Sequence, residues 1–178
     1  MKILTLLRHA KSTWDDPVAR DFDRPLNPRG RRAARTVGRA MRDQGLEFDA
    51  VIASPAVRVV ETLRDIGEGY GRALEPRHEQ DLYLATPSTL LDQVRQADNA
   101  VERLLVVGHN PGLEQLAILL SGSDESGRMG ELELKYPTAT VAEIRFEVER
   151  WADVAAGGGT LVRFIRPRDL DPELGPED

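Results

Sequence analysis

Short apolar runs alternate with longer amphipathic segments over the first two thirds of the chain. The longer segments repeat their apolar positions at helical spacing, as Ala34, Val37 and Met41 do, whereas the short runs are typical of buried strands. The expected strands are residues 3–7, 49–53 and 104–107, and the expected helices are residues 28–44, 56–67, 88–97 and 111–120. This alternation predicts an α/β fold, a three-layer αβα sandwich whose central sheet is mostly parallel and covered on both faces.

The last third of the chain has a different pattern. Residues 121–130 are polar and glycine-rich, so we expect a loop there. Residues 138–148 and 160–165 have strand character and flank a run of three glycines. We therefore expect a C-terminal antiparallel addition to the parallel sheet.

One domain accounts for nearly the whole sequence. We assign it to residues 1–166, with a short edge strand near residues 73–75. The remaining residues, 167–178, are acidic and proline-rich and are expected to form a frayed tail.

Composition narrows the classes of protein. The chain has 178 residues and no cysteine, which excludes disulfides, thiolate zinc sites and cysteine nucleophiles. Its net charge of −6 makes a nucleic-acid-binding surface unexpected. Of its 24 basic residues only Lys2, Lys11 and Lys135 are lysines, and the abundant arginines suit oxyanion ligands.

The hydrophobic runs do not predict a membrane protein. None approaches 18 apolar residues, and the run at residues 3–7 is too short for a secretory signal and is followed at once by Arg8. We expect a cytoplasmic protein that has no membrane contact and acts as a monomer.

Four dipeptides pair a good helix N-cap with proline: Asn27-Pro28, Ser54-Pro55, Thr86-Pro87 and Asn110-Pro111. The second and fourth follow predicted strands directly. Their helices are therefore expected to begin at the carboxyl edge of the sheet, where open α/β sheets bind ligands and helix N-termini favour anions.

The predicted strand ends carry histidine and arginine. The first strand ends in Arg8-His9, the second leads to Arg58 in the first turn of its helix, and the third ends in Gly108-His109. If the strands are parallel, two histidines and two arginines meet at one edge of the sheet. Arginine binds oxyanions through charge-assisted bonds, and a neutral imidazole can attack phosphorus, so this set indicates a phosphoryl site.

Each of these residues also has a structural interpretation. A single histidine after a strand is usually a packed or solvated residue, and Arg58 could form an ordinary helical ion pair with Glu61. A zinc site built from the three histidines is disfavoured because no pair has i, i+4 spacing and Arg8 would repel the cation. His78, in a charged stretch, is interpreted as a surface residue.

Five segments, in order, resemble the histidine phosphatase superfamily, in the SixA-like phosphohistidine phosphatase branch. They are Leu6-Leu7-Arg8-His9-Ala10-Lys11-Ser12, Asp23-Arg24-Pro25-Leu26-Asn27-Pro28-Arg29-Gly30, Ser54-Pro55-Ala56-Val57-Arg58-Val59-Val60-Glu61-Thr62, Val107-Gly108-His109-Asn110-Pro111 and Tyr136-Pro137-Thr138-Ala139. The resemblance covers residues 2 to about 146 and implies a phosphoglycerate-mutase-like fold and a phosphatase that needs neither metal nor cofactor.

The resemblance also implies roles for individual residues. His9 would be the nucleophile that becomes phosphorylated, and Arg8, Arg58 and His109 would surround the transferring phosphoryl group. Lys11, Ser12 and Asn110 are candidate substrate contacts. A hydrogen bond to the second ring nitrogen of His9 should fix its tautomer, and Asn110, Ser54 and Glu61 are the candidate partners for that bond.

The general acid is the least defined part of the predicted site. Glu79 and Asp81 are candidates, but their segment does not match the acid block of the mutase branch, and Trp14-Asp15 stands where that branch has asparagine after the tryptophan. The poor match for a general acid favours a phosphoramidate substrate, because its bridging nitrogen protonates more readily than an ester oxygen.

The expected substrate is phosphohistidine on a protein, because the chain leaves little sequence for a lid over the site. Two alternatives remain open. One is a phosphomonoesterase acting on a small phosphorylated metabolite, and the other is a non-catalytic phosphate-binding module.

Overall fold

The computed structural model describes residues 1–15 and 20–175 and has a seven-stranded sheet at its centre. The strand order is β3-β2-β4-β1-β6-β7-β5. In chain order the strands are β1 Lys2–Arg8, β2 Ala50–Ala53, β3 Arg77–His78, β4 Arg103–Gly108, β5 Ser121–Asp124, β6 Val141–Phe146 and β7 Gly159–Ile165. The helices are α1 Pro28–Asp43, α2 Val57–Tyr70, α3 Pro87–Arg95, α4 Gly112–Leu120, α5 Met129–Leu134 and α6 Pro167–Leu170.

The sheet is mixed in the way the sequence predicts. Strands β3, β2, β4 and β1 run parallel to one another, β6 runs antiparallel to β1, and β7 runs antiparallel to β6. The α/β fold with a parallel half and a C-terminal antiparallel addition is therefore confirmed. Strand β5 then pairs parallel with β7 and closes the far edge.

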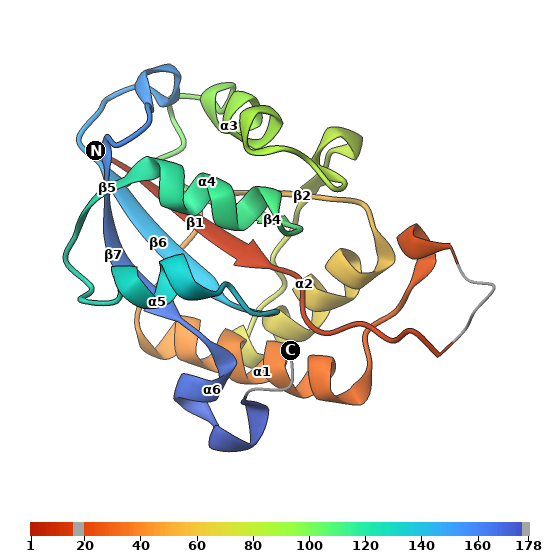
Figure 1. Ribbon diagram of the computed structural model, residues 1–178. Helices are drawn as coiled ribbons and strands as arrows, with labels where there is room; N and C mark the ends of the chain where they lie inside the picture. The colour runs from red at the N-terminus through yellow and green to blue at the C-terminus, as the bar shows by residue number, and fades with distance from the viewer. Residues whose placement is uncertain (16–19, 176–178) are drawn as a thin grey trace.

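Helices cover both faces of the sheet, which gives three layers (Figure 1). Alternate β1 residues face opposite ways: Leu4 and Leu6 pack with the apolar residues of α3, α4 and α5, whereas Leu7 packs with those of α1 and α2. This alternation is what the two-residue period of a strand requires when both faces are buried.

Two of the four predicted N-caps are confirmed and two are wrong. Asn27 accepts a bond from Gly30 N at 2.7 Å, and Thr86 caps α3 in the same way. Helices α2 and α4 begin later than expected, at Val57 and Gly112, because their Ser-Pro and Asn-Pro pairs form the turn before the helix. The polar side chains of those two turns are thereby available to the site described below.

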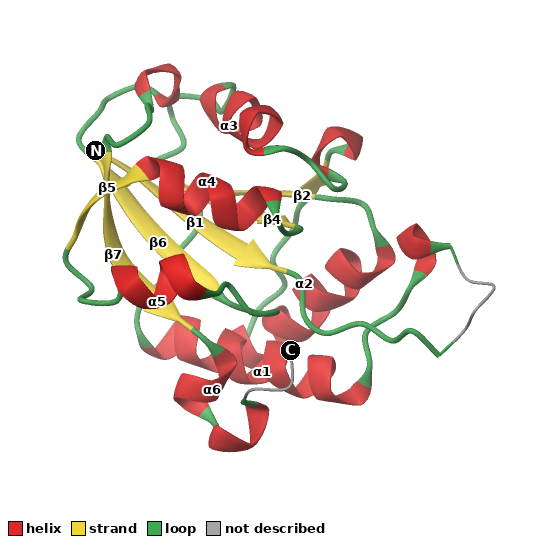
Figure 2. Ribbon diagram, in the orientation of Figure 1, coloured by secondary structure: helices red, strands yellow, loops and turns green. Residues whose placement is uncertain are grey.

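Local structure differs from the expectation in three further places. The edge strand lies at Arg77–His78 rather than at residues 73–75. The expected loop at residues 121–130 contains β5 and the start of α5 (Figure 2). Strand β5 is mostly exposed, so its polar sequence has no apolar pattern that would predict a strand. Helix α2 is also longer than expected: it ends at Tyr70 and is capped by Gly71, whose φ of 90° suits glycine.

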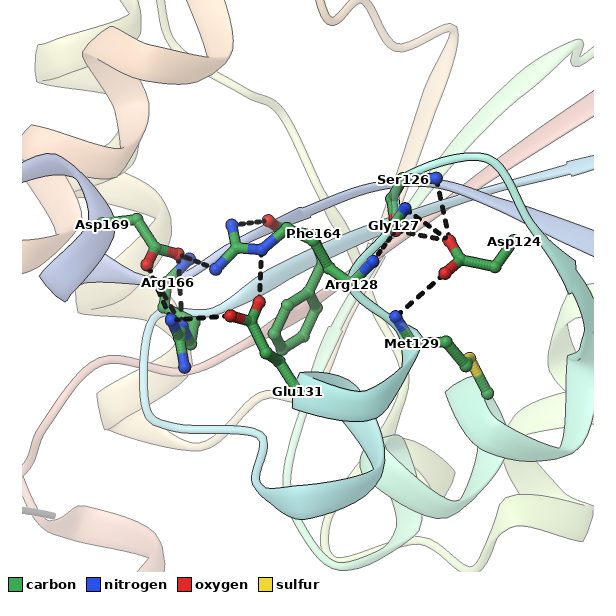
Figure 3. A network of polar contacts seen from close by, with 9 residues as sticks. All are labelled: Asp124, Ser126, Gly127, Arg128, Met129, Glu131, Phe164, Arg166 and Asp169. Atoms are coloured by element: carbon green, nitrogen blue, oxygen red, sulfur yellow. Dashed lines mark hydrogen bonds and ion pairs between the residues drawn. The ribbon is translucent and has the colours of Figure 1, made fainter.

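The expected frayed tail is instead folded through residue 175. It forms α6 and a single turn at Pro172–Leu174, and Arg32 of α1 binds Asp171 at 2.6 Å and Glu173 at 2.8 Å. Figure 3 shows a second attachment, in which Arg128 Nη2 donates to Asp169 Oδ2 at 2.7 Å. The acidic residues that predicted a solvated tail are the groups that fix it to arginines; residues 176–178 of the predicted tail lie outside the described residues.

Candidate active site

The register of β1 and β4 brings the two predicted strand-end histidines together. Arg8 lies opposite Gly108, so His9 and His109 follow at the same edge of the sheet, and His9 N donates to Gly108 O at 3.1 Å. Their ring centroids are 5.3 Å apart. Arg58, from the first turn of α2, places Nη2 3.2 Å from His109 Nδ1. The structure thus joins three segments that are distant in the sequence.

These groups line a cleft of about 400 Å³. The described residues around it are Arg8, His9, Lys11, Ser12, Trp14, Asp21, Arg24, Arg58, Leu84, His109, Asn110 and Thr138. Arg58 and His109 are each only 2% exposed, whereas Trp14 on the rim is 74% exposed. The cleft therefore has a buried, cationic floor and an apolar rim open to solvent.

The tautomer of His9 follows from its hydrogen bond. Nδ1 lies 2.7 Å from the carbonyl oxygen of Ala10. A carbonyl can only accept, so Nδ1 carries the proton and Nε2 holds the free lone pair. The partner is thus the backbone of Ala10, and the expectation of Asn110, Ser54 or Glu61 in this role is wrong.

The loop after β1 is anchored from two sides. Ala10 N donates to Thr62 Oγ1 at 2.9 Å, and that hydroxyl donates to the carbonyl of Arg58 at 2.6 Å, so one threonine links His9's neighbour to the arginine of α2. On the other side Gly30 of α1 packs against Lys11, and a Cβ there would lie 2.1 Å from Lys11 O. Glycine at this position lets α1 approach the loop closely.

His109 has the opposite tautomer. Arg58 Nη2 can only donate, so His109 Nδ1 accepts, and Nε2 carries the proton that it donates to Ser54 Oγ at 2.8 Å. The Ser54 hydroxyl also accepts from Ala56 N at 3.2 Å. Ser54 therefore orients His109 rather than His9.

Both histidines are held neutral at physiological pH. Burial lowers the pKa of His9 well below its ordinary value, and the charges of Arg8 and Arg58 lower it further against the opposing bond to Ala10. Burial and the Arg58 charge lower the pKa of His109 to about 3. A neutral His9 is the form that can act as a nucleophile.

This geometry predicts the protonation pattern of His109 in solution. Because its pKa lies near 3, we expect its ring to stay neutral from pH 5 to pH 8, with Nδ1 bare and Nε2 protonated. Nitrogen-15 NMR of the imidazoles, assigned by comparison with a His109→Gln variant, measures this directly. A His109 ring that gains a second proton near pH 6.5 would contradict the prediction.

Arg8 and Arg24 are fixed by oxygen acceptors. Arg8 Nη1 donates to the carbonyl of Tyr136 at 2.9 Å, at the start of the late Tyr-Pro-Thr-Ala segment. Arg24, which the sequence interpretation did not assign to the site, is 7% exposed and donates to Ser12 Oγ and, at 3.3 Å, to Thr13 O. Its position in the second matching segment is the signal that could have found it.

Asp21 is the main residue that the sequence interpretation missed. Its Oδ2 accepts from Arg58 Nη2 at 3.0 Å and from the Tyr83 hydroxyl, its Oδ1 accepts from Arg24 Nη2 at 3.0 Å, and its carbonyl accepts from Arg58 Nη1 at 2.7 Å. Burial alone would raise the pKa of Asp21, but the bonds from Tyr83, Arg24 and Arg58 outweigh it and lower the pKa to about 2. Asp21 is therefore an ionised anchor for Arg58, and unsuited to acid catalysis.

The depressed pKa of Asp21 predicts a pH-dependent contribution to stability. The group binds a proton more weakly when folded, so its contribution is present above pH 3.8 and is lost as the pH falls toward 2. Asp21→Asn should lower the free energy of unfolding at pH 6 by about 1 kcal/mol, after allowance for solvent screening. Urea titrations at pH 6 and pH 2.5 test this: the difference between variant and wild type should shrink at the lower pH, and an unchanged difference would contradict it.

The two candidate general acids do not join the cleft. Glu79 pairs with Arg77 at 2.8 Å beside the edge strand, and Asp81 is exposed in the following turn. Neither is among the residues that line the cleft. The predicted contacts Lys11, Ser12 and Asn110 do line it, and Asn110 is held by bonds to Tyr136 O at 3.0 Å and from Glu114 N at 3.2 Å.

Other parts of the described structure offer less chemistry. A larger hollow of about 550 Å³ lies between α2 and residues 71–78, but it contains none of the clustered cations. No group of three or more histidine, aspartate or glutamate side chains in residues 1–15 and 20–175 is arranged to hold a metal ion. None of the helices in this part of the chain is long and apolar enough to cross a bilayer.

Known proteins share this fold and much of this sequence. The sequence profile of the histidine phosphatase superfamily (branch 1) matches residues 4–83. The uncharacterized protein Rv1276c of Mycobacterium tuberculosis is 40% identical over 167 residues, which cover 91% of this chain and 100% of the relative. Together with the 30% identical solved structure described next, the profile shows that the chain belongs to the histidine phosphatase superfamily, and it is accordingly a phosphatase.

Solved structures place it in the SixA-like branch of that superfamily. The Nakamurella multipartitia protein assigned as a phosphohistidine phosphatase SixA is 30% identical with a TM-score of 0.79, and the match covers 93% of this chain and 96% of that one. Its counterpart from Agrobacterium tumefaciens is 26% identical with a TM-score of 0.76, covering 93% and 98%. The resemblance found in the sequence is thereby confirmed.

Proposed function

We propose that this phosphatase removes phosphoryl groups from phosphohistidine on proteins, through a phosphorylated His9 and without a metal ion. One observation carries the proposal. The cleft sets the free Nε2 of a neutral His9 beside Arg8 and Arg58, while the one carboxylate among its described lining residues, Asp21, is ionised. The site is thus equipped for attack on phosphorus and poorly equipped to protonate a leaving group.

The chemistry follows from these protonation states. The lone pair of His9 Nε2 forms a bond to phosphorus as the bond from phosphorus to the substrate's nitrogen breaks. Water then attacks the phosphoryl group on His9, which releases inorganic phosphate, passes a proton to solvent and restores neutral His9. Arg8 and Arg58 stabilise the charge on the equatorial oxygens in both steps, since preorganised cations are the main catalytic resource for phosphoryl transfer.

His109 can assist once the substrate has bound. Its Nδ1 accepts from Arg58 in the unliganded cleft. An oxyanion beside the ring favours the charged imidazole, so binding of the phosphoryl group raises the proton affinity of Nδ1 and turns it into a donor. Ser54 keeps the ring oriented throughout, because its bond is to the other nitrogen.

The absence of a suitable acid among the described lining residues favours phosphohistidine over a phosphate ester. An ester oxygen needs a proton from the enzyme as it leaves, a task that a carboxyl with a pKa near 2 does not perform at neutral pH. Phosphohistidine protonates on its other ring nitrogen, so it departs as neutral imidazole. The exposed rim around Trp14 and Leu84 supports access by a side chain displayed on a protein.

A comparison of substrates tests the proposal. Hydrolysis is measured on a phosphohistidyl peptide, on p-nitrophenyl phosphate and on a panel of sugar and nucleotide phosphates, in the presence of EDTA. We expect the phosphohistidyl peptide to have the highest kcat/KM by at least about 10-fold. Equal rates on p-nitrophenyl phosphate would count against the proposal, and a strong preference for one metabolite would favour a phosphomonoesterase instead.

A further inference from the structure

Two large apolar side chains are exposed on the rim of the phosphoryl cleft. Trp14 is 74% exposed and Leu84 is 54% exposed, and both line the cleft. We call these two residues the apolar pair. Apolar groups that line a binding cleft gain free energy when a ligand covers them, so the pair is suited to an apolar or aromatic part of the substrate.

The indole of Trp14 is held through one of its faces. The guanidinium carbon of Arg24 lies 3.4 Å from the ring centroid and covers that face. Arg24 is itself buried and fixed by bonds to Ser12 Oγ and, at 3.0 Å, to Asp21 Oδ1. The ring is otherwise largely exposed, so it offers a preoriented surface on which a second planar group can stack.

Leu84 is placed on the rim by an unusual backbone conformation. Its φ of 50° lies in the left-handed region, which leucine rarely adopts. The residues before it are anchored, because Leu82 is fully buried and the Tyr83 hydroxyl donates to Asp21 Oδ2. A costly conformation of this kind persists only where the surrounding contacts impose it, and such positions cluster at ligand sites.

One network ties the apolar pair to the phosphoryl-binding cations. Asp21 binds both Arg24, which lies under the indole, and Tyr83, which precedes the leucine of the pair. Asp21 also accepts from Arg58 Nη2 at 3.0 Å, and the Tyr83 ring lies edge-on to His109 with centroids 5.4 Å apart. The pair therefore has a fixed position relative to the groups that would hold the phosphoryl oxygens.

We propose that the apolar pair binds the imidazole ring of the substrate phosphohistidine, with Trp14 stacked on that ring as it leaves. The inference rests on the proposed function. His9 lies on the buried floor, and the bond that breaks lies in line with and opposite its attacking Nε2. The leaving group is therefore on the solvent side of phosphorus, where the rim begins. A neutral planar ring is the kind of group that stacks on an exposed indole.

Two substrates with the same kind of bond test this contact. A phosphohistidyl peptide and phosphoramidate both have a phosphorus–nitrogen bond, but the first releases an imidazole ring and the second releases ammonia. The readout is the ratio of their kcat/KM values, peptide over phosphoramidate. Trp14→Ala should lower this ratio roughly 10-fold, the size of one aromatic contact. Trp14→Phe keeps an aromatic face and should lower the ratio by less than about 3-fold.

Leu84→Ala tests the second member of the pair. We expect it to lower the same ratio about 3-fold, as for the loss of roughly one buried methylene contact. Leu134→Ala is the matched control, because Leu134 on α5 is 84% exposed and is not among the described residues that line the cleft. The ratio should be unchanged in this control.

The two substrates also separate the contact from a purely structural role of Trp14 beside Arg24. Loss of support for Arg24 would slow both substrates by the same factor and leave the ratio unchanged, which would overturn the inference. An undiminished kcat/KM for the peptide in Trp14→Ala would overturn it as well. A wild-type enzyme that hydrolyses p-nitrophenyl phosphate but neither phosphorus–nitrogen substrate would instead contradict the proposed function itself.

Discussion

His9→Ala is expected to reduce turnover by at least about 10⁴-fold, because it removes the proposed nucleophile. The remaining cations would still attract an oxyanion, since Arg8, Arg58 and His109 line the same cleft. We therefore expect vanadate to bind the variant while steady-state hydrolysis of a phosphohistidyl peptide is lost. The measurement combines kcat with vanadate binding by calorimetry.

His78→Ala is the matched control for this prediction. It removes the third histidine, which is exposed and whose Nδ1 lies 3.3 Å from Ser54 O outside the cleft. We expect its kcat to stay within about two-fold of the wild type. A His9→Ala enzyme that retains a few per cent of activity would contradict the assignment of His9 as nucleophile.

Arg58→Ala is expected to cost roughly 2–4 kcal/mol of transition-state stabilisation, or about 10²–10³ in kcat, as for loss of one preorganised donor. The guanidinium is 2% exposed and makes bonds to Asp21 and His109, so its charge acts in a site from which water is largely excluded. Single-turnover kinetics with a phosphohistidyl peptide measure the loss in the chemical step.

Two comparisons separate catalysis from folding in this variant. Arg64→Ala removes an exposed arginine of the same helix, whose nearest carboxylate is 3.9 Å away, and should leave kcat within about two-fold. Removal of Arg58 alone leaves Asp21 without its partner, so the double variant Arg58→Ala with Asp21→Asn tests the same loss without an unpaired charge. If Arg58→Ala and the double variant both had native-like circular dichroism and a kcat near that of the wild type, a catalytic role for Arg58 would be contradicted.

Much of this structure could be predicted because strong local patterns and the parallel-strand rule agree. The runs that become β1, β2 and β4 are short and apolar, and parallel strands have their carboxyl ends at one edge. That rule alone brings His9, Arg58 and His109 into one place, and the structure brings them together there. The prediction needed no knowledge of side-chain contacts.

The features that were missed depend on contacts between segments that no local pattern encodes. Asp21 begins a short 3-10 helix at Asp21–Asp23, and only the folded chain reveals that its side chain reaches Arg58 on α2. The acidic composition of the tail predicted a solvated segment, because the sequence does not reveal that Arg32 and Arg128 form ion pairs with its carboxylates. Glu79 was proposed for its chemistry alone; in the structure it pairs with Arg77 and does not line the cleft.

The most direct test of covalent catalysis by His9 is to trap the phosphorylated enzyme. The protein is mixed briefly with a phosphohistidyl peptide, quenched in base and digested, and the phosphorylated peptide is identified by mass spectrometry. We predict an acid-labile, base-stable phosphoryl group on Nε2 of His9, formed and lost at rates that match turnover. Full turnover without that label, or a label on His109 or His78 in its place, would contradict the mechanism.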